Sequence, residues 1–229
     1  MDFASAPAPD ITHLILPVPS FEPDGRIRGG GILEHILADL PENVTVIGGN
    51  LNHPALQGYQ TIDLLQDPLY VAQNAAITAD CAIRIAREQL PAVWNRCPVL
   101  VIGWGRIGKC LSQQLKSLGC DVTVAARKPQ DLALLQALGY GSVATENLHQ
   151  QVPRYRVIFN TVPVPMLDAQ QCSLCDPDCL QIDLASSPGL LGNRVISALA
   201  LPGKYAPETS GNLIAGSIIR LLKRKEYTA

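Results

Sequence analysis

The chain has 229 residues, of which 47% are hydrophobic and 17% are charged, and its formal net charge is −2 at pH 7. This apolar content is sufficient for the core of one large domain or of two small ones. Because there is no basic excess to neutralise a phosphate backbone, the charge excludes nucleic acid as the main partner.

The amino-terminal end reads MDFASAPAPD, with an acid where a signal peptide needs a basic region, and no run of about 18 apolar residues follows. We therefore expect neither secretion nor a membrane-spanning segment, and we assign the protein to the cytoplasm. The seven cysteines are an odd number spread over predicted strands and helices. This distribution is typical of thiols that a reducing cytoplasm keeps unpaired.

Residues 1–66 are predicted to form a small companion domain, a reduced flavodoxin-like α/β unit. The apolar runs predict strands at Thr12–Ser20, Asn43–Asn50 and Tyr59–Leu65, and a helix at Gly29–Leu40. A domain this thin buries little surface, so we expect it to pack against the rest of the chain or against a second protomer. We therefore expect a homodimer.

Residues 67–91 are predicted to form one long connecting helix, because apolar residues recur at helical spacing from Asp67 to Leu90 and Pro91 follows. In residues 92–229 strands and helices alternate, which predicts a doubly wound parallel sheet of the Rossmann type. Strands are expected at 98–102, 121–126, 142–144, 156–161, 179–185 and 196–201. Helices are expected at 106–118, 129–138 and 207–223, the last packing back on the first domain.

Three glycines in the spacing GxGxxG stand between an apolar strand and a helix, in the sequence CPVLVIGWGRIGKCL. In a dinucleotide-binding turn the first permits the tight turn, the second lets the backbone approach a pyrophosphate, and the third lets the helix pack closely on the strand. The alternative is a structural turn without a ligand. The predicted cofactor-binding residues here are Gly103, Trp104, Gly105, Arg106, Ile107 and Gly108.

The next strand ends in TVAARKPQ, which gives Arg127 and Lys128 where an NAD site has an acid for the ribose hydroxyls. A guanidinium and an ammonium suit a 2′-phosphate by charge, so the sequence favours NADP over NAD. The alternative is that both side chains belong to a solvated turn, in which case NAD is equally acceptable.

Three further strand ends are rich in turn formers and small polar residues: NTVPVP, DLASSPG and LPGKYAPETSG. Because ligands of open parallel sheets gather at the carboxyl ends of strands, we expect these segments to line the nicotinamide side of the cleft. Thr161, Val162 and Pro163 are predicted to contact the cofactor. Lys204, in a predicted Pro-Gly loop, is placed to hold a substrate carboxylate, whereas Glu208, Thr209 and Ser210 could instead cap the last helix.

These segments together resemble the A subunit of dipicolinate synthase: IGWGRIG, AAR, NTVP, DLASSPG, LPGKYAPETSG, and upstream LILPVPS and NAAITADCAI. The resemblance covers nearly all of the chain from about Thr12. It implies hydride transfer between a nicotinamide cofactor and a small dicarboxylated, dihydropyridine-like substrate, and it implies that the partner is a second synthase subunit. Within that implied reaction the candidates for proton transfer are Lys204, Asp80, Asp183 and Glu208, and those for substrate binding are Asn74, Thr78, Ser186, Thr209 and Ser210.

The sequence also departs from the family's pattern. The family has a longer amino-terminal domain, and this chain is shorter between Gly189 and Leu201, where it reads LLGN. These departures favour a second hypothesis, a regulatory or partner protein that binds NADP without turnover.

No histidine occupies a predicted strand end beside the nicotinamide, so a histidine acid or base is not expected. The cysteines of CSLCDPDC, which are Cys172, Cys175 and Cys179, have a spacing that could serve a metal. A structural zinc site needs four ligands, and no fourth cysteine or histidine is close in sequence. We therefore expect ordinary thiols and no metal.

Overall fold

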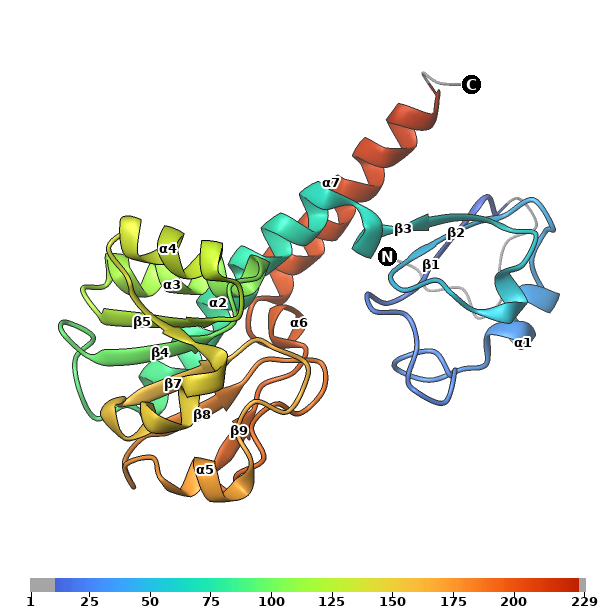
Figure 1. The fold of residues 1–229 in the computed structure, drawn as a ribbon. Coiled ribbons are helices and arrows are strands. Elements are labelled where there is room, and N and C mark those ends of the chain that lie inside the picture. The colour runs from blue at the N-terminus through green and yellow to red at the C-terminus, as the bar shows by residue number, and fades with distance from the viewer. Residues whose placement is uncertain (1–10, 227–229) are drawn as a thin grey trace. The chain divides into compact units, whose positions relative to one another are not determined.

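The computed structural model describes residues 11–226. Contacts within the chain define two compact units: one joins the residues up to Gln73 with those from Gly211 onward, and the other is Asn74–Ser210. Two long helices contribute to both units, α2 (Pro68–Gln89) and α7 (Pro207–Glu226) (Figure 1). Within the described residues no helix is long and apolar enough to cross a membrane.

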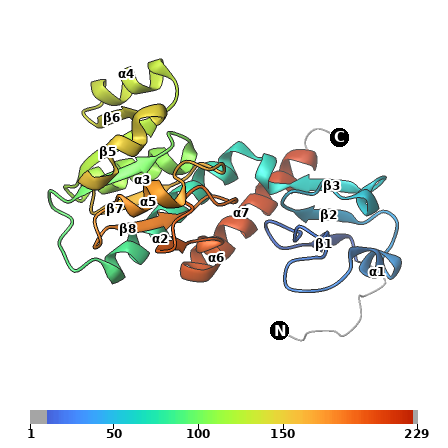
Figure 2. The same ribbon diagram turned by 60° about the horizontal axis from the view of Figure 1, so that its bottom comes forward.

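The first unit contains a parallel sheet of order β1-β2-β3, with the strands side by side in Figure 2. The strands are β1 (His13–Ile15), β2 (Thr45–Gly48) and β3 (Gln60–Asp63), so the three predicted strands are confirmed but shorter. Helix α1 (Leu33–Ala38) begins later than predicted. The reason is local: Gly29, Gly30 and Gly31 have φ of 89°, 109° and 104°, in the left-handed region that a helix cannot continue through.

Both faces of this sheet are covered by apolar side chains. On one face Leu33 and Leu37 of α1 pack with Val44 and Val46. The other face includes Ile47, and it packs against residues of the two long helices that lie within the same unit, including Tyr70 and Ile218. Sandwiching gives the thin sheet a core on each side.

The second unit is built on a six-stranded parallel sheet of order β6-β5-β4-β7-β8-β9. Its strands are β4 (Pro98–Ile102), β5 (Asp121–Ala126), β6 (Gly141–Ala144), β7 (Val157–Asn160), β8 (Leu180–Asp183) and β9 (Val195–Ser197). The order reverses between β4 and β7, which is the topological switch of a doubly wound Rossmann-type sheet. The predicted fold class is thus confirmed.

Helices cover both faces of the larger sheet. One face packs α3 (Arg106–Ser117), α4 (Pro129–Ala137) and the later turns of α2 over β4 and β5. The other face is covered by short 3-10 turns at residues 145–154 and by α5 (Ala169–Ser173), a helix that was not predicted from the sequence.

The strand predicted at 196–201 is wrong in its second half. Strand β9 ends at Ser197, Ala200 has a left-handed φ of 54°, and a short helix, α6 (Leu201–Tyr205), begins directly after it. An extended strand cannot pass through a left-handed residue without breaking its ladder. Lys204 therefore lies in a helix and not in the predicted Pro-Gly loop.

Candidate nucleotide-binding site

The carboxyl ends of five neighbouring strands form a row in the second unit. The register pairs Ile102 with Ala125 of β5 and with Asn160 of β7, and Asn160 with Asp183 of β8. Asp183 in turn pairs with Ser197 of β9. Because neighbouring strands are about 4.8 Å apart, the segments that follow these residues lie next to one another along one edge.

The glycine turn occupies the centre of this row, directly after β4. Gly103 is buried with φ of 106°, and a Cβ there would lie 2.5 Å from Oγ1 of Thr161. A Cβ on Gly108 would lie 2.0 Å from the carbonyl oxygen of Gly103. Neither position can carry a side chain, so the turn and the close helix approach depend on glycine.

Gly105 differs from the other two glycines. It is the N-cap residue of α3, where no side chain accepts a hydrogen bond from the helix amides. A Cβ built on Gly105 would meet nothing within 4 Å. The first N–H groups of a 12-residue helix are therefore left open beside free space at a strand edge, which fits a bound pyrophosphate.

Of the other residues predicted in this turn, Arg106 is exposed, and Trp104 and Ile107 pack against the core of the second unit. The Trp104 ring lies edge-on to Tyr140 at 5.8 Å and under the Lys109 ammonium at 5.7 Å. The side chains of Trp104 and Ile107 thus hold the turn in place, and their backbone remains at the edge.

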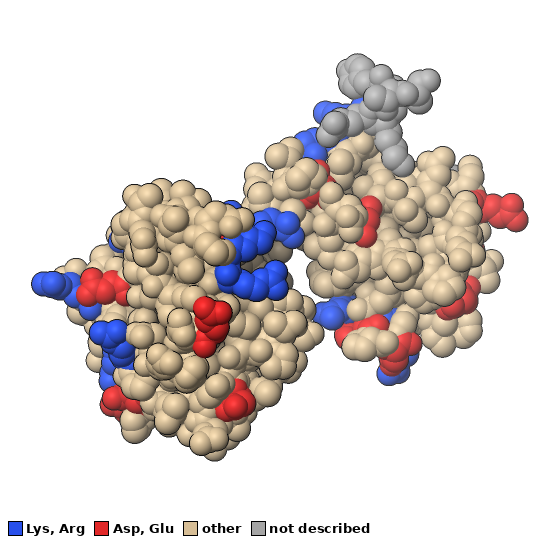
Figure 3. Space-filling view, viewed as in Figure 1, with Lys and Arg blue, Asp and Glu red and all other residues tan. Residues whose placement is uncertain are grey.

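Arg127 and Lys128 follow β5, the strand on one side of β4, and both are exposed. Lys128 is the N-cap residue of α4, and the carboxyl end of β5 carries no acid before Asp131 in the first turn of that helix. Figure 3 shows one large group of lysine and arginine side chains on the second unit, with other basic side chains and scattered acidic ones elsewhere on the same face. Two exposed cations thus follow the strand next to the glycine turn.

Thr161 follows β7, the strand on the other side of β4. Its hydroxyl donates to the carbonyl oxygen of Ile102 at 2.9 Å, and both it and Val162 border the glycine turn, since a Cβ on Gly103 would touch each. Pro163 is exposed beyond them. All three predicted residues therefore lie at the edge next to the turn, on the side away from β5.

Asp183 is 4% exposed, and its carboxylate accepts four hydrogen bonds. The donors are the side chain of Asn160 at 2.8 Å and the backbone amides of Ala185, Gly189 and Leu190 at 3.1, 2.7 and 2.9 Å. A carboxylate engaged in this way has all its acceptor positions occupied and shapes the loop after β8. Exposed Ser186 is carried by that loop.

Asn160, which is fully buried at the end of β7, was not among the residues predicted from the sequence. Its amide donates to Asp183 and to the carbonyl oxygen of Val162, and its oxygen accepts from the Val162 amide. Asn160 therefore ties the end of β7 to the end of β8. The available signal was a polar amide closing an otherwise apolar strand, RVIFN.

The remaining predicted residues of the α6–α7 segment differ in exposure. The ammonium of Lys204 lies 5.4 Å from the ring centre of Tyr205, and Lys204 is exposed. Glu208 and Thr209 are exposed in the first turn of α7, whereas Ser210 is buried. Lys204, Glu208 and Thr209 thus keep polar atoms accessible.

The α2 candidates lie elsewhere in the second unit. Thr78 is buried, and its hydroxyl donates to the carbonyl oxygen of Asn74 at 2.7 Å, within the helix itself. Asp80 is exposed in a groove that it shares with Gln113 and Ser117, in the last two turns of α3. Gln113 is seven residues beyond Arg106, or about 10 Å along α3 at 1.5 Å per residue, so Asp80 is displaced from the glycine turn.

An alignment of 157 positions, which covers 65% of the chain, is 30% identical to the A subunit of dipicolinate synthase of Bacillus subtilis (strain 168) and covers 53% of that protein. The crystal structure of the dipicolinate synthase A chain from Bacillus subtilis matches 98% of this chain with a TM-score of 0.82 and 25% identity, over 82% of its own length. The chain is thus similar to the dipicolinate synthase A subunits, in sequence over part of its length and in fold over nearly all of it.

Two further solved structures share the fold of this chain. The structure of the A subunit of dipicolinate synthase from Bacillus halodurans matches 93% of this chain over 80% of its own length, with 23% identity and a TM-score of 0.82. The structure of a transhydrogenase from Sinorhizobium meliloti matches 94% of this chain over 74% of its own length, with 13% identity and a TM-score of 0.71. No protein-family model matches the chain. In sequence, the chain spans about half the length of the curated relative, 53%.

The seven cysteines of the chain are free thiols, and six of them are buried. Burial raises the pKa of Cys120 to about 11, and the neighbouring Cys175 thiol together with burial raises the pKa of Cys179. Among residues 11–226, no group of three or more histidine, cysteine or acidic side chains is arranged to hold a metal ion. Cys120 and Cys179 are therefore protonated thiols at neutral pH.

Proposed function

We propose that the second unit binds NADP along the edge formed by β5, β4 and β7, and that the protein is an oxidoreductase similar to the A subunit of dipicolinate synthase. It would transfer hydride between the nicotinamide and a small dicarboxylated, dihydropyridine-like substrate. The observation that carries the proposal is the uncapped amino-terminus of α3, which opens at Gly105 at the topological switch of the sheet.

The order of residues along the edge supports the orientation of the nucleotide. Arg127 and Lys128 follow β5 on one side of the glycine turn, and Thr161–Pro163 follow β7 on the other. In a doubly wound sheet the adenosine half lies over the second strand, and the nicotinamide half lies across the switch. The cations would bind the 2′-phosphate, and the loops after β7 and β8 would surround the nicotinamide.

The residues proposed to contact substrate are those whose polar atoms remain accessible. Lys204 would hold a carboxylate, Ser186 and Thr209 would donate hydrogen bonds, and Glu208 would move a proton. Bound nicotinamide supplies the hydride donor or acceptor, and the protein supplies position, cations and exclusion of water. Asp183 has no free acceptor position, so its proposed role is to fix the loop that carries Ser186.

The nucleotide part of the proposal is tested by calorimetric titration with NADP and with NAD. We expect NADP to bind about 10-fold more tightly, the difference expected from one added charge-assisted contact. Equal affinities would contradict the role of Arg127. Absence of any binding would contradict the site as a whole.

The reaction is tested separately, by following NADPH consumption and NADP reduction with a dihydrodipicolinate mixture. The assay is run with the chain alone and with added candidate second subunits, because a curated relative is named as the A subunit of a synthase. Turnover that is lost on Lys204→Met, with NADP affinity unchanged, supports the substrate residues. Unchanged turnover and substrate affinity would remove Lys204 from the proposal.

A second function, a nucleotide-binding partner protein without turnover, rests on one observation. The carboxylate of Asp183, a predicted candidate for proton transfer, is fully engaged in hydrogen bonds within the chain. Nucleotide binding without hydride transfer, with or without partners, would establish this alternative and reject the first.

A further inference from the structure

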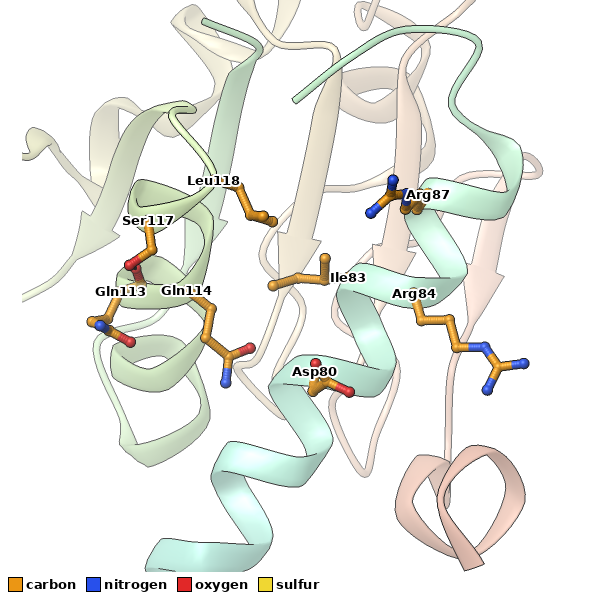
Figure 4. A pocket seen from close by; sticks show the side chains of 8 residues that line it. All are labelled: Asp80, Ile83, Arg84, Arg87, Gln113, Gln114, Ser117 and Leu118. Atoms are coloured by element: carbon orange, nitrogen blue, oxygen red, sulfur yellow. The ribbon is translucent and has the colours of Figure 1, made fainter. Parts of the chain in front are cut away.

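A groove between α2 and α3 in the second unit lies away from the glycine turn. It has a volume of about 460 Å³ and is lined by Asp80, Ile83, Arg84, Arg87, Gln113, Gln114, Ser117 and Leu118. Figure 4 shows Asp80, Ile83 and Arg87 along one side of α2, facing the turns of α3 that carry Gln114 and Leu118. The proposed function leaves this surface without a role.

The charges of the groove are of two kinds. Arg84 points away from it and is engaged: its guanidinium pairs with Glu88 at 3.1 Å and reaches the carbonyl oxygen of Tyr205 at 3.4 Å. Asp80 and Arg87 are both exposed, and neither makes an ion pair or a side-chain hydrogen bond with any residue in the described part of the chain. One negative and one positive group thus remain unmatched on the same groove.

The spacing of Asp80 and Arg87 is seven residues, two helical turns, so both lie on one stripe of α2, about 10 Å apart. Between them the floor of the groove is apolar. Ile83 lies at its centre, and Leu118 on the opposite wall is 40% exposed. Along α2 the stripe therefore carries an acidic, then an apolar, then a basic side chain, and its midpoint lies between residues 83 and 84.

We propose that this groove is the interface of a homodimer, in which α2 of one protomer packs antiparallel to α2 of a second copy. A two-fold axis through the midpoint of the stripe brings Asp80 of each protomer against Arg87 of the other. The same patch meets itself, as a closed two-fold interface requires, and both unmatched charges of the groove gain a partner.

The charge pattern selects this occupant over others. An anion would be attracted by Arg87 and repelled by Asp80, and a uniformly charged partner would meet one like charge. A surface with the reverse order of charges satisfies both, and a copy of the chain turned by 180° presents that order.

The test uses two charge reversals, Asp80→Arg and Arg87→Asp, and sedimentation velocity of each protein alone and of their equimolar mixture. The wild type is expected to be a dimer. Each single reversal places like charges together twice and should raise the dimer dissociation constant about 100-fold. In the mixture, one chain carries only arginines and the other only aspartates at the two positions, so a heterodimer should form.

The matched control is Glu146→Arg, a reversal at an exposed carboxylate outside the groove, which should remain dimeric. If a reversal lowers the thermal unfolding temperature markedly, Asp80→Asn and Arg87→Gln replace it, each with an expected 10-fold rise in the dissociation constant, about one lost ion pair per site. A wild type that stays monomeric would overturn the proposal. Single reversals that remain dimeric, or a mixture that remains monomeric, would overturn it equally.

Discussion

Helices α2 and α3 both follow a strand of a parallel sheet, but their amino-termini differ in how the backbone amides are hydrogen-bonded. In the first unit Asp67 accepts a hydrogen bond from the Tyr70 amide at 2.8 Å, and Arg220 pairs with the same carboxylate. In the second unit the N-cap of α3 is Gly105, which has no side-chain partner and open space beside it. One helix end is closed by the chain itself, and the other has no side-chain cap within the described chain.

The strand ends of the two units show the same contrast. In the first unit, Asp63 accepts from the amides of Asn50 and Leu51, and the hydroxyl of Ser20 accepts from the amide of Gly49. These bonds use donors that an anion would otherwise bind. Topology alone therefore does not make a binding site at a sheet edge; free donors are also needed.

The largest effect is expected from Gly108→Ala. Its Cβ would collide with the Gly103 carbonyl, so helix and turn must separate, and the free energy of unfolding should fall by about 2 to 4 kcal/mol. Nucleotide affinity, measured by calorimetric titration, should fall about 100-fold because the α3 amides move.

Gly105→Ala is the matched control for Gly108→Ala, because its Cβ meets only open space. The unfolding free energy should change by less than about 1 kcal/mol, since only the N-cap preference is altered. NADP affinity should nevertheless fall about 10-fold, because the methyl group occupies the path of the pyrophosphate. Unchanged affinity would show that the ligand does not approach α3 here, and the contrast with α2 would then concern stability only.

The closed amino-terminus of α2 is tested by Arg220→Met. Asp67 is 7% exposed, and without the guanidinium its charge has only backbone partners, so stability at pH 7 should fall by about 3 kcal/mol. The hydrogen bond from Arg220 lowers the pKa of Asp67. Because the pKa of Asp67 is lower in the folded state, its charge stabilises the fold at pH values above the ordinary pKa of about 3.9. This stabilisation is lost as the pH falls through the folded-state pKa.

Denaturant unfolding at several pH values checks this prediction, because the difference between wild type and Arg220→Met should shrink in acid. Arg84→Met removes an exposed pair, with side chains 60% and 55% exposed, and should change stability by less than about 1 kcal/mol. A difference between wild type and Arg220→Met that stayed constant down to strongly acidic pH would contradict the role given to Asp67.

Smaller effects are expected where a carboxylate closes a strand end. Asp183→Asn places an amide donor against backbone donors in a buried site and should lower the unfolding free energy by about 2 kcal/mol. Asp63→Asn, in a half-buried site of the first unit, should lower it by about 1 kcal/mol. Thermal unfolding of both variants shows which one loses more stability. A larger loss in Asp63→Asn would mean that the hydrogen bonds of Asp183 stabilise the fold less than its contacts indicate.

The smallest change concerns nucleotide choice. Arg127→Gln removes a cation from the end of β5 and should reduce the preference for NADP over NAD about 10-fold, with little effect on stability. Titration with both nucleotides measures the ratio. If the ratio does not change, Arg127 belongs to a solvated turn and takes no part in nucleotide choice.

Most elements of the second unit could be predicted from the sequence because their signals are local. The apolar run at 98–102, the glycine spacing and the amphipathic helix that follows lie within about 20 consecutive residues. The strands at 98–102 and 121–126 have the predicted bounds. Helix α5 was missed because it depends on a capping box between Asp168 and Gln171 and not on an apolar stripe.

From the sequence, the site could be predicted only where its residues lie within one continuous segment of the chain. The sequence makes Asp183 a candidate proton carrier, because nothing local shows its four donors, one of which comes from a residue 23 positions away. The sequence likewise makes Asp80 a candidate for proton transfer, because its position in the helix does not show which end of α3 lies opposite it. Both depend on tertiary contacts that neither composition nor periodicity encodes.

The packing of Trp104 gives the protein a built-in optical probe. The chain has two tryptophans. Trp94 is 8% exposed in the core of the second unit, and Trp104 belongs to the glycine turn, where its buried indole N–H has no hydrogen-bond partner in the described structure. Indole emission responds to nearby charge and hydration, so nucleotide entering the turn would be seen in Trp104 fluorescence without a label, against a steady signal from Trp94.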